Sequence, residues 1–331
     1  MPPLSIAARR GNAVESVHRV SVAVVDPAGR RVATNGDPRF PVFMRSAAKP
    51  FQAMPIVADG AADRFAMSLE ELALACASHN SERRHVAIAR GLLERLDCTE
   101  ADLACGPHRA LALELGVLLP DERPPDDLAP PGHLASNCSG KHVGMLALAR
   151  AHGWPVAGYH RPDHPVQQRC RAEVARWTGL PPAAIAEAVD GCGVVTFQVP
   201  LDAMAGAFAR FGVADDEPAT RLRGAMLAHP DLVAGRYRLC TAVMRAYPGE
   251  VVAKVGADGV YGAALPRRGL GLAIKVEDGD AHANMAALVA VLRQLGFEAR
   301  PSLDRFARFP VYNTRNEIVG ALDAAGAISF E

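Results

Sequence analysis

The order of strand-like and helix-like segments constrains the fold of this chain most strongly. A strand pattern rich in β-branched residues runs from His18 to Val25 and resumes from Arg31 to Thr34 after the turn sequence "DPAG". Further strand candidates lie late in the chain, in "EVVAKVG", "VYGAALP", "GLGLAIKVE" and "NEIVGALDA". This order predicts an α/β (α+β) fold, in which both ends of the chain form a mostly antiparallel sheet with flanking helices.

Helical patterns fill the middle of the chain, roughly residues 60–240, and predict a helical subdomain within a single domain over residues 1–331. One helix is expected from Ser46 to Ala58. Another follows Ser68, which has capping-box spacing to Glu71. Later helices are predicted over 141–152, 164–177, 201–211, 218–247 with a break near Pro230, and 281–295. Residues 119–132, "LPDERPPDDLAPPG", contain five prolines and five charges, which indicates a surface loop that could act as a flap.

The charge balance argues against several function classes. Thirty-six basic residues match thirty-six acidic ones, so the sequence offers no general attraction for nucleic acid or anionic lipid. The N-terminal segment lacks the apolar core of a signal peptide, and no run approaches the ~18 apolar residues of a membrane span. We therefore expect a soluble, cytoplasmic protein. Its seven scattered cysteines show no disulfide framework, so reduced thiols are expected.

Ser46 and Lys49 are the first candidates for chemistry. They lie three residues apart in "FMRSAAKPFQAMPIV", so on a helix they share one face. Pro50 is tolerated only in a first turn, which predicts a helix that begins near Ser46. Serine becomes a nucleophile when a base takes its proton, and lysine is such a base only when burial or a second cation lowers its pKa. The ordinary interpretation is an N-capping serine beside a solvated lysine.

A second polar cluster lies in "CASHNSERRH", where Ser78, His79 and Asn80 separate two helical patterns. Small polar residues at a helix junction usually serve as caps, and the residues alone favour that interpretation. The alternative is that these side chains converge on a functional site.

Two cysteine-containing segments suggest a metal site. Cys138 and Lys141 lie three residues apart in "NCSGKHVG", with His142 next to them, and "VDGCGVV" places Asp190 and Cys192 among glycines. A thiolate from each segment could bind a soft metal such as zinc. Two distant cysteines are, however, more often small buried hydrophobic residues.

Lys254 ends a predicted strand in "AKVGADGVYG" and could supply a second cation. The ordinary interpretation is a charged residue that protects a sheet edge. Lys275, on a neighbouring predicted strand, is another candidate for the same role. The sequence contains no phosphate-binding G-x-x-x-x-G-K-[ST] loop, HExxH motif or G-x-S-x-G elbow. This weakens interpretations as a nucleoside triphosphatase, a zinc protease or an α/β-hydrolase.

Together these segments resemble the asparaginase II family, the class 3 or rhizobial-type L-asparaginases. "FMRSAAKPFQ", "CASHNSERRH", "ASNCSGKHVGML", "DGCGVVTFQVPL" and "KVGADGVYG" occur in the family's order and spacing over nearly the whole chain. The resemblance implies a fold like that of the serine β-lactamases and the serine-dependent glutaminases. It also implies hydrolysis of L-asparagine to L-aspartate and ammonia by a homodimer.

The resemblance also implies roles for individual residues. Ser46 with Lys49 resembles the family's first Ser–Lys tandem, and Ser78 with Lys254 resembles the second. Cys138, Lys141 and Cys192 match the family's zinc site. The residues expected to bind the substrate are Arg45, Asn80, His142 and Asp190.

The mechanism that this implies is acyl transfer. Lys49 would take the proton of Ser46, which attacks the amide carbon, while Ser78 and Lys254 deliver a proton to the departing ammonia. Ser78 is the alternative nucleophile.

Two other functions stay open. The chain could be a serine amidase for glutamine or a β-lactam, or a non-catalytic relative that binds a ligand or metal.

Overall fold

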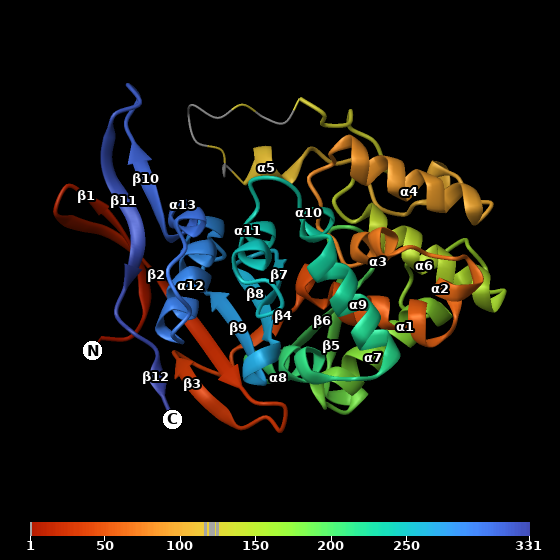
Figure 1. Cartoon of the computed structure of the whole chain (residues 1–331), viewed down its shortest axis with the longest axis horizontal. Coiled ribbons are helices and arrows are strands. Elements are labelled where there is room, and N and C mark those ends of the chain that lie inside the picture. Colours follow the sequence, from red (N-terminus) through yellow and green to blue (C-terminus); the bar gives the residue numbers. More distant parts are fainter. Residues whose placement is uncertain (1, 116–117, 119–122, 124–125) are drawn as a thin grey trace. The chain divides into compact units, whose positions relative to one another are not determined.

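The computed structural model describes residues 2–115, 118, 123 and 126–331. The chain divides into two units (Figure 1). The sheet unit comprises residues 1–42, 199–213 and 242–331, and the helical unit comprises residues 43–198 and 214–241. Six residues of the predicted flap, 119–122, 124 and 125, lie outside the described part of the chain. That the two units make one domain stays a prediction.

The sheet unit is built on a nine-stranded sheet with antiparallel pairing between its strands. The main path runs β10-β11-β1-β2-β9-β8-β7, while β3 pairs with β2 and β12. Both ends of the chain supply strands, which confirms the predicted fold class. The strands are β1 (Ser5–Arg10), β2 (Ala13–Val25), β3 (Arg31–Asn35), β7 (Val252–Gly256), β8 (Val260–Leu265), β9 (Leu270–Val276), β10 (Arg308–Tyr312), β11 (Ile318–Ala325) and β12 (Ser329–Phe330).

Helices α8 (Leu201–Val213) and α12 (Ala281–Gln294) pack on this sheet. Two strand glycines let α8 approach closely. A Cβ at Gly262 would lie 2.0 Å from the ring of Phe208, and one at Gly271 would lie 2.0 Å from the carbonyl oxygen of Ala205. The strands β8 and β9 therefore carry no side chain where α8 crosses them. Short α13 (Asp304–Ala307) precedes β10.

The helical unit surrounds α1 (Lys49–Ala58), which packs against α6, α7 and α9. The predicted capping box at Ser68 and Glu71 is confirmed at the start of α3. The other helices of this unit are α2 (Ala61–Arg64), α3 (Leu69–Ala75), α4 (Arg83–Arg95), α5 (Leu111–Glu114), α6 (Ser139–His152), α7 (Pro165–Thr178), α9 (Glu217–Ala228) and α10 (Pro230–Val233). Helix α11 (Leu239–Ala246) begins in the helical unit and ends in the sheet unit. A small sheet has the order β4 (Pro41–Phe43), β6 (Val195–Pro200), β5 (Ala186–Val189).

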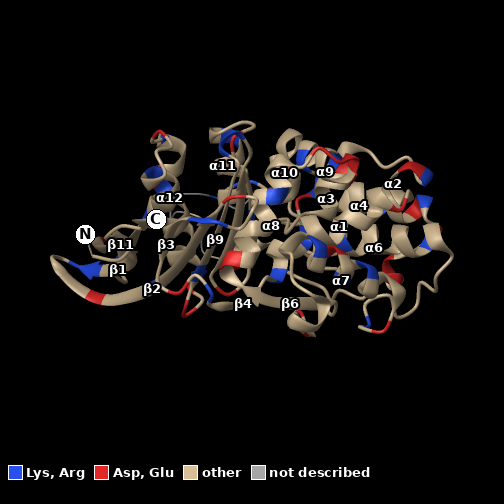
Figure 2. Cartoon of the chain, turned by 90° about the horizontal axis from the view of Figure 1, so that it is seen from below, with Lys and Arg blue, Asp and Glu red and all other residues tan. Residues whose placement is uncertain are grey.

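Charges of both signs are interspersed along the elements of each unit (Figure 2). Among the described residues, no helix is long and apolar enough to cross a membrane.

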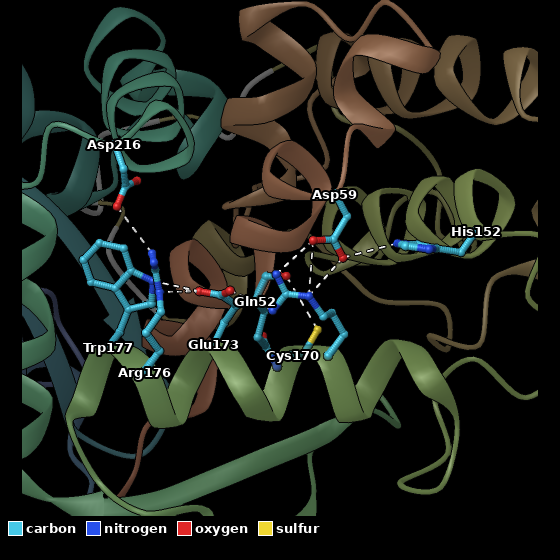
Figure 3. A network of polar contacts seen from close by, with 9 residues as sticks. Gln52, Asp59, His152, Cys170, Glu173, Arg176, Trp177 and Asp216 are labelled. Carbon is cyan, nitrogen blue, oxygen red and sulfur yellow. Dashed lines mark hydrogen bonds and ion pairs between the residues drawn. The ribbon is translucent and has the colours of Figure 1, made fainter.

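A network of ion pairs attaches α7 to the end of α1 (Figure 3). Arg169 donates two parallel hydrogen bonds of 2.9 Å to the carboxylate of Asp59 and a third, of 2.7 Å, to Glu173. Trp177 donates to the other oxygen of Glu173 at 3.1 Å. The guanidinium of Arg169 therefore links α7 to the C-terminal end of α1. Bidentate pairs of this kind are among the stronger polar contacts in proteins.

Replacing Arg169 with alanine is expected to lower the free energy of unfolding by about 2–3 kcal/mol, because two partly buried carboxylates lose their hydrogen bonds to the guanidinium. Urea unfolding followed by circular dichroism measures this difference. The matched control is Arg30→Ala, since Arg30 pairs with Asp26 while its own side chain is 83% exposed. This control should leave the unfolding midpoint nearly unchanged. Equal midpoints for the two variants would contradict the role given to Arg169.

Candidate active site

Lys49 is the first residue of α1, and its side chain is completely buried. Its amine donates to Ser78 Oγ at 2.9 Å and to the backbone oxygen of Ala77 at 2.5 Å. The interpretation of Lys49 as a solvated surface amine is therefore wrong. The hydroxyl that the amine contacts belongs to Ser78, whereas Ser46, in the preceding turn, makes no hydrogen bond to it within the described part of the chain.

Ser46 lies in a 3₁₀ turn over Arg45–Ala48 that precedes α1, so the helix begins three residues later than predicted. Ser46 caps neither element, because the N-cap positions are Met44 and Ala48 and neither has a side-chain cap. Ser46 is half-buried, and its backbone N–H donates to no group among the described residues. Arg45 has a φ of 49°, a left-handed conformation that costs energy for a residue with a side chain and is often found at active sites.

The segment with Ser78, His79 and Asn80 connects α3 to α4 and is almost completely buried. The prediction that these residues cap helices is wrong, because the C-cap of α3 is Cys76 and the N-cap of α4 is Glu82. His79 instead accepts from the backbone N–H of Ser81 through Nδ1, which directs its Nε2–H toward Ser139 Oγ at 2.9 Å. Burial, together with the nearby His85 and Lys49, lowers the pKa of His79 well below its ordinary value.

Arg238 is a buried cation that the sequence analysis missed. Its guanidinium donates to Asn80 Oδ1 at 3.0 Å and to the backbone oxygen of Ser78 at 3.3 Å. The amide nitrogen of Asn80 donates to the backbone oxygen of Arg236 at 2.7 Å. Arg238 is one of 32 arginines and lies in no motif, so only its burial beside Ser78 distinguishes it.

Cys138, Lys141 and Cys192 lie together, as predicted for a metal site. The Lys141 amine donates to Cys192 Sγ at 3.0 Å, and both groups are buried. A hydrogen bond with Cys138 and the positive charge of Lys141 lower the pKa of Cys192 to about 5. The same hydrogen bond and burial raise the pKa of Cys138 to about 12. Burial opposes the charge of Lys141, but the adjacent Cys192 and Cys138 outweigh it and raise the pKa of the amine.

This donor set fits a zinc ion in its chemistry, because two sulfurs and an amine are ligands of the class that zinc accepts. The ammonium of Lys141 holds the Cys192 thiolate here and would have to give up its proton to bind a metal. Among the described residues, no three His, Cys, Asp or Glu side chains are grouped as metal ligands, so any such site depends on the lysine.

Asp190 and Arg45 form an ion pair, with Nε donating to Oδ1 at 2.7 Å. Burial raises the pKa of Asp190, but Lys141 and Arg45 lower it more, so the net shift is downward. His142 is completely buried, and Tyr159 contacts its Nδ1 at 2.5 Å. Burial and the positive charge of Lys141 lower the pKa of His142 well below its ordinary value.

Two glycines of α6 bring these groups close to the Lys49–Ser78 pair. A Cβ at Gly140 would lie 2.2 Å from the backbone oxygen of Leu74 in α3, and one at Gly144 would lie 2.5 Å from Ile56 in α1. The charge of Lys49 also affects the pKa values of Cys138 and His142. The helical unit thus brings the hydroxyls, the thiols and the buried amines into one electrostatic environment.

Lys254 belongs to the sheet unit and is completely buried on β7, where its amine donates to the backbone oxygen of Val255 at 2.9 Å. Its partner across the strands is Gly262, so its side chain lies on the α8 face of the sheet. Lys275 is only half-buried and donates to the backbone oxygen of Asp258. Because its side chain is completely buried, Lys254 does not fit the interpretation as a charged residue that protects a sheet edge. The pairing of Lys254 with Ser78 stays a prediction.

Several solved structures are similar to this chain at low sequence identity. The solved structures that match include Mglu in its native form, with 15% identity and a TM-score of 0.47, covering 85% of this chain and 65% of Mglu. The form of Mglu with tris and glutamate has 16% identity and a TM-score of 0.38, covering 85% and 61%. A putative beta-lactamase from Bacteroides dorei DSM 17855 has 13% identity and a TM-score of 0.37, covering 84% and 88%.

The chain thus corresponds to just under two thirds of the length of Mglu. No curated protein matches the sequence. The family model of L-asparaginase II, however, matches residues 6–324, which include every predicted site residue. Because this match extends over almost all of the 331 residues, the chain belongs to the L-asparaginase II family.

Proposed function

We propose that this protein hydrolyses the side-chain amide of L-asparagine to L-aspartate and ammonia through an ester on Ser46. The observation that carries the proposal is the buried amine of Lys49, which bonds to Ser78 Oγ and lies one turn after Ser46. Burying a lysine costs stability, so a buried amine that bonds to the Ser78 hydroxyl and lies one turn after Ser46 supports a catalytic use.

Accessibility favours Ser46 as the nucleophile. Ser46 is half-buried, whereas Ser78 is only 2% exposed. In the proposed step, Ser46 Oγ bonds to the amide carbon, and its proton passes to the Lys49 amine directly or through Ser78 Oγ. The carbon–nitrogen bond then breaks, and the departing nitrogen takes the proton that Ser46 gave up and leaves as ammonia. Water cleaves the ester and restores the serine. The part of Lys254 in this proton transfer remains a proposal.

The backbone N–H of Ser46 supports the same assignment. It has no acceptor among the described residues, and it belongs to the nucleophile itself. A donor in this place can stabilise the negative charge that develops on the amide oxygen. We propose that the Arg45–Asp190 pair receives the α-carboxylate and α-ammonium of the substrate. Asn80 contributes to the substrate site indirectly. Its side-chain amide bonds to Arg238 and to the backbone of Arg236, and so holds Arg238 beside Ser78.

Ammonia release from L-asparagine tests the proposed function, with glutamine and the β-lactam nitrocefin as competing substrates. We expect turnover of asparagine to exceed that of the other two. Faster turnover of glutamine or nitrocefin would instead indicate a serine amidase of different specificity. Binding of asparagine without ammonia release would indicate a non-catalytic relative. The predicted homodimer is tested separately by light scattering on the purified protein.

We also propose that Cys138, Lys141 and Cys192 bind zinc, which would orient the substrate and shape the pocket. Cobalt substitution tests this without an activity assay, because thiolate ligands give Co²⁺ a charge-transfer absorption. The wild type is expected to show this band and Cys192→Ser to lose it. Cys98→Ser removes another thiol of the same unit, one that interacts with the backbone oxygen of Leu96 and with Arg150, and should retain the band. A wild type without the band would refute the metal site.

A further inference from the structure

Tyr159, which lies outside the sequence motifs, forms a buried polar pair with His142. The hydroxyl of Tyr159 lies 2.5 Å from His142 Nδ1, and the two rings meet edge to face at 83°. Both side chains are almost completely buried. The same hydroxyl accepts a hydrogen bond of 3.0 Å from the backbone N–H of Ala104.

The direction of the hydrogen bond follows from the available partners. The Tyr159 oxygen accepts from Ala104, and its hydrogen has no acceptor other than His142 Nδ1 among the described residues. If Nδ1 carried the proton instead, the tyrosine hydrogen would be buried without a partner, at a cost in free energy. The hydroxyl therefore donates to Nδ1. A neutral imidazole that accepts at Nδ1 carries its own hydrogen on Nε2.

The Nε2 atom of His142 is buried and contacts no hydrogen-bond partner within the described part of the chain. Buried donors in folded proteins are rarely left without an acceptor, so this N–H requires one from outside the chain. Besides burial, Lys141 and Lys49 lower the pKa of His142 while Cys138 raises it, so both amines act on the imidazole. A neutral donor beside two amines suits an anionic oxygen better than a neutral one.

We infer that Tyr159 is a positioning residue, which holds His142 as an Nε2–H donor for a carboxylate oxygen of the ligand. This inference rests on the proposed function for the identity of the ligand, an amino acid with a carboxylate. The tautomer of His142 is inferred without reference to the proposed function. Tyr159 itself lies behind the imidazole and need not touch the substrate.

Nitrogen NMR of protein with ¹⁵N-labelled histidine reads the tautomer directly. The His142→Gln variant identifies the His142 signals by their loss. We expect the wild type to show one tautomer, with the hydrogen on Nε2, and Tyr159→Phe to show a mixture of both. The matched control is Tyr247→Phe, which removes a buried hydroxyl bonded to the Glu298 backbone oxygen in the sheet unit and should leave the His142 signals unchanged.

A wild-type His142 with the hydrogen on Nδ1, or charged at neutral pH, would overturn the inference without any variant. A Tyr159→Phe spectrum identical to that of the wild type would also overturn it. Addition of L-aspartate, which carries the required carboxylates, should shift the Nε2–H signal of the wild type. Saturating L-aspartate that moves other signals but leaves this one in place would refute the contact with the ligand.

A double-mutant cycle separates positioning from a purely structural role. We expect Tyr159→Phe to raise KM for asparagine about tenfold, the effect of losing one well-oriented hydrogen bond. In the His142→Gln background the same change should have almost no further effect. Equal increases in both backgrounds would mean that Tyr159 acts independently of His142. An inactive protein that retains the Tyr159-dependent tautomer and the aspartate shift would refute the proposed function alone.

Discussion

Lys49→Ala is expected to lower kcat for asparagine hydrolysis up to about 10⁴-fold, the upper range for loss of a general base. The variant removes the amine that bonds to Ser78 Oγ at 2.9 Å and leaves no other amine one turn from Ser46. Binding groups such as Arg45 and Asp190 remain, so KM should change much less than kcat. Initial rates of ammonia release over a range of asparagine concentrations give both constants.

Lys49→Arg distinguishes proton transfer from simple charge. A guanidinium retains the positive charge and the ability to donate, but it does not act as a base near neutral pH. We therefore expect this variant to be as inactive as Lys49→Ala. The control is Lys275→Ala, which removes the half-buried lysine of β9. Substantial activity in Lys49→Arg, with folding verified by thermal melting, would show that Lys49 acts through its charge alone.

Ser46→Ala is expected to reduce kcat by about 10⁴–10⁶-fold, as loss of a nucleophile does in other serine hydrolases. Ser78→Ala should reduce kcat by only about 10²–10³-fold. This variant lacks the Ser78 hydroxyl that assists proton transfer, but it retains the attacking oxygen of Ser46. The difference between the two variants is the measurement that matters. The reverse ranking would transfer the nucleophilic role to Ser78, whose hydroxyl already contacts Lys49.

Covalent trapping provides independent proof of the nucleophile. A diazoketone analogue of asparagine would alkylate the attacking side chain. Trypsin separates the two serines, because Arg45 and Arg64 bracket Ser46 while Arg64 and Arg83 bracket Ser78. We expect the adduct on the peptide with Ser46, and its absence in the Ser46→Ala variant. An adduct on the other peptide would contradict the proposed mechanism.

Much of the fold could be predicted because its patterns are local. The β-branched run of β2, the glycine-rich turns between the late strands and the capping box of α3 each specify an element within a few residues. The strand β1 and the first half of β2 were missed. The segment over Ala13–Val17 is exposed along its whole length, so it lacks the alternation of apolar and polar residues that reveals a half-buried strand.

The sequence indicated candidate site residues where several reactive side chains occur together in a short motif. Ser46, Lys49, Cys138 and Lys141 occur in pairs whose spacing alone suggests a shared helix face. Contacts between distant segments carry no such signal. The bond from Lys49 to Ser78 spans 29 positions and that from Arg238 to Asn80 spans 158, and both depend on how helices pack rather than on sequence spacing.

The burial of lysine has a practical consequence for attaching this protein to a support. The chain contains only four lysines, and Lys49, Lys141 and Lys254 are almost completely buried. Amine-reactive chemistry on the folded protein would therefore reach one ε-amine, that of Lys275, in preference to the other three. Coupling through this position would fix the molecules in nearly one orientation and spare the amines on which the proposed chemistry depends.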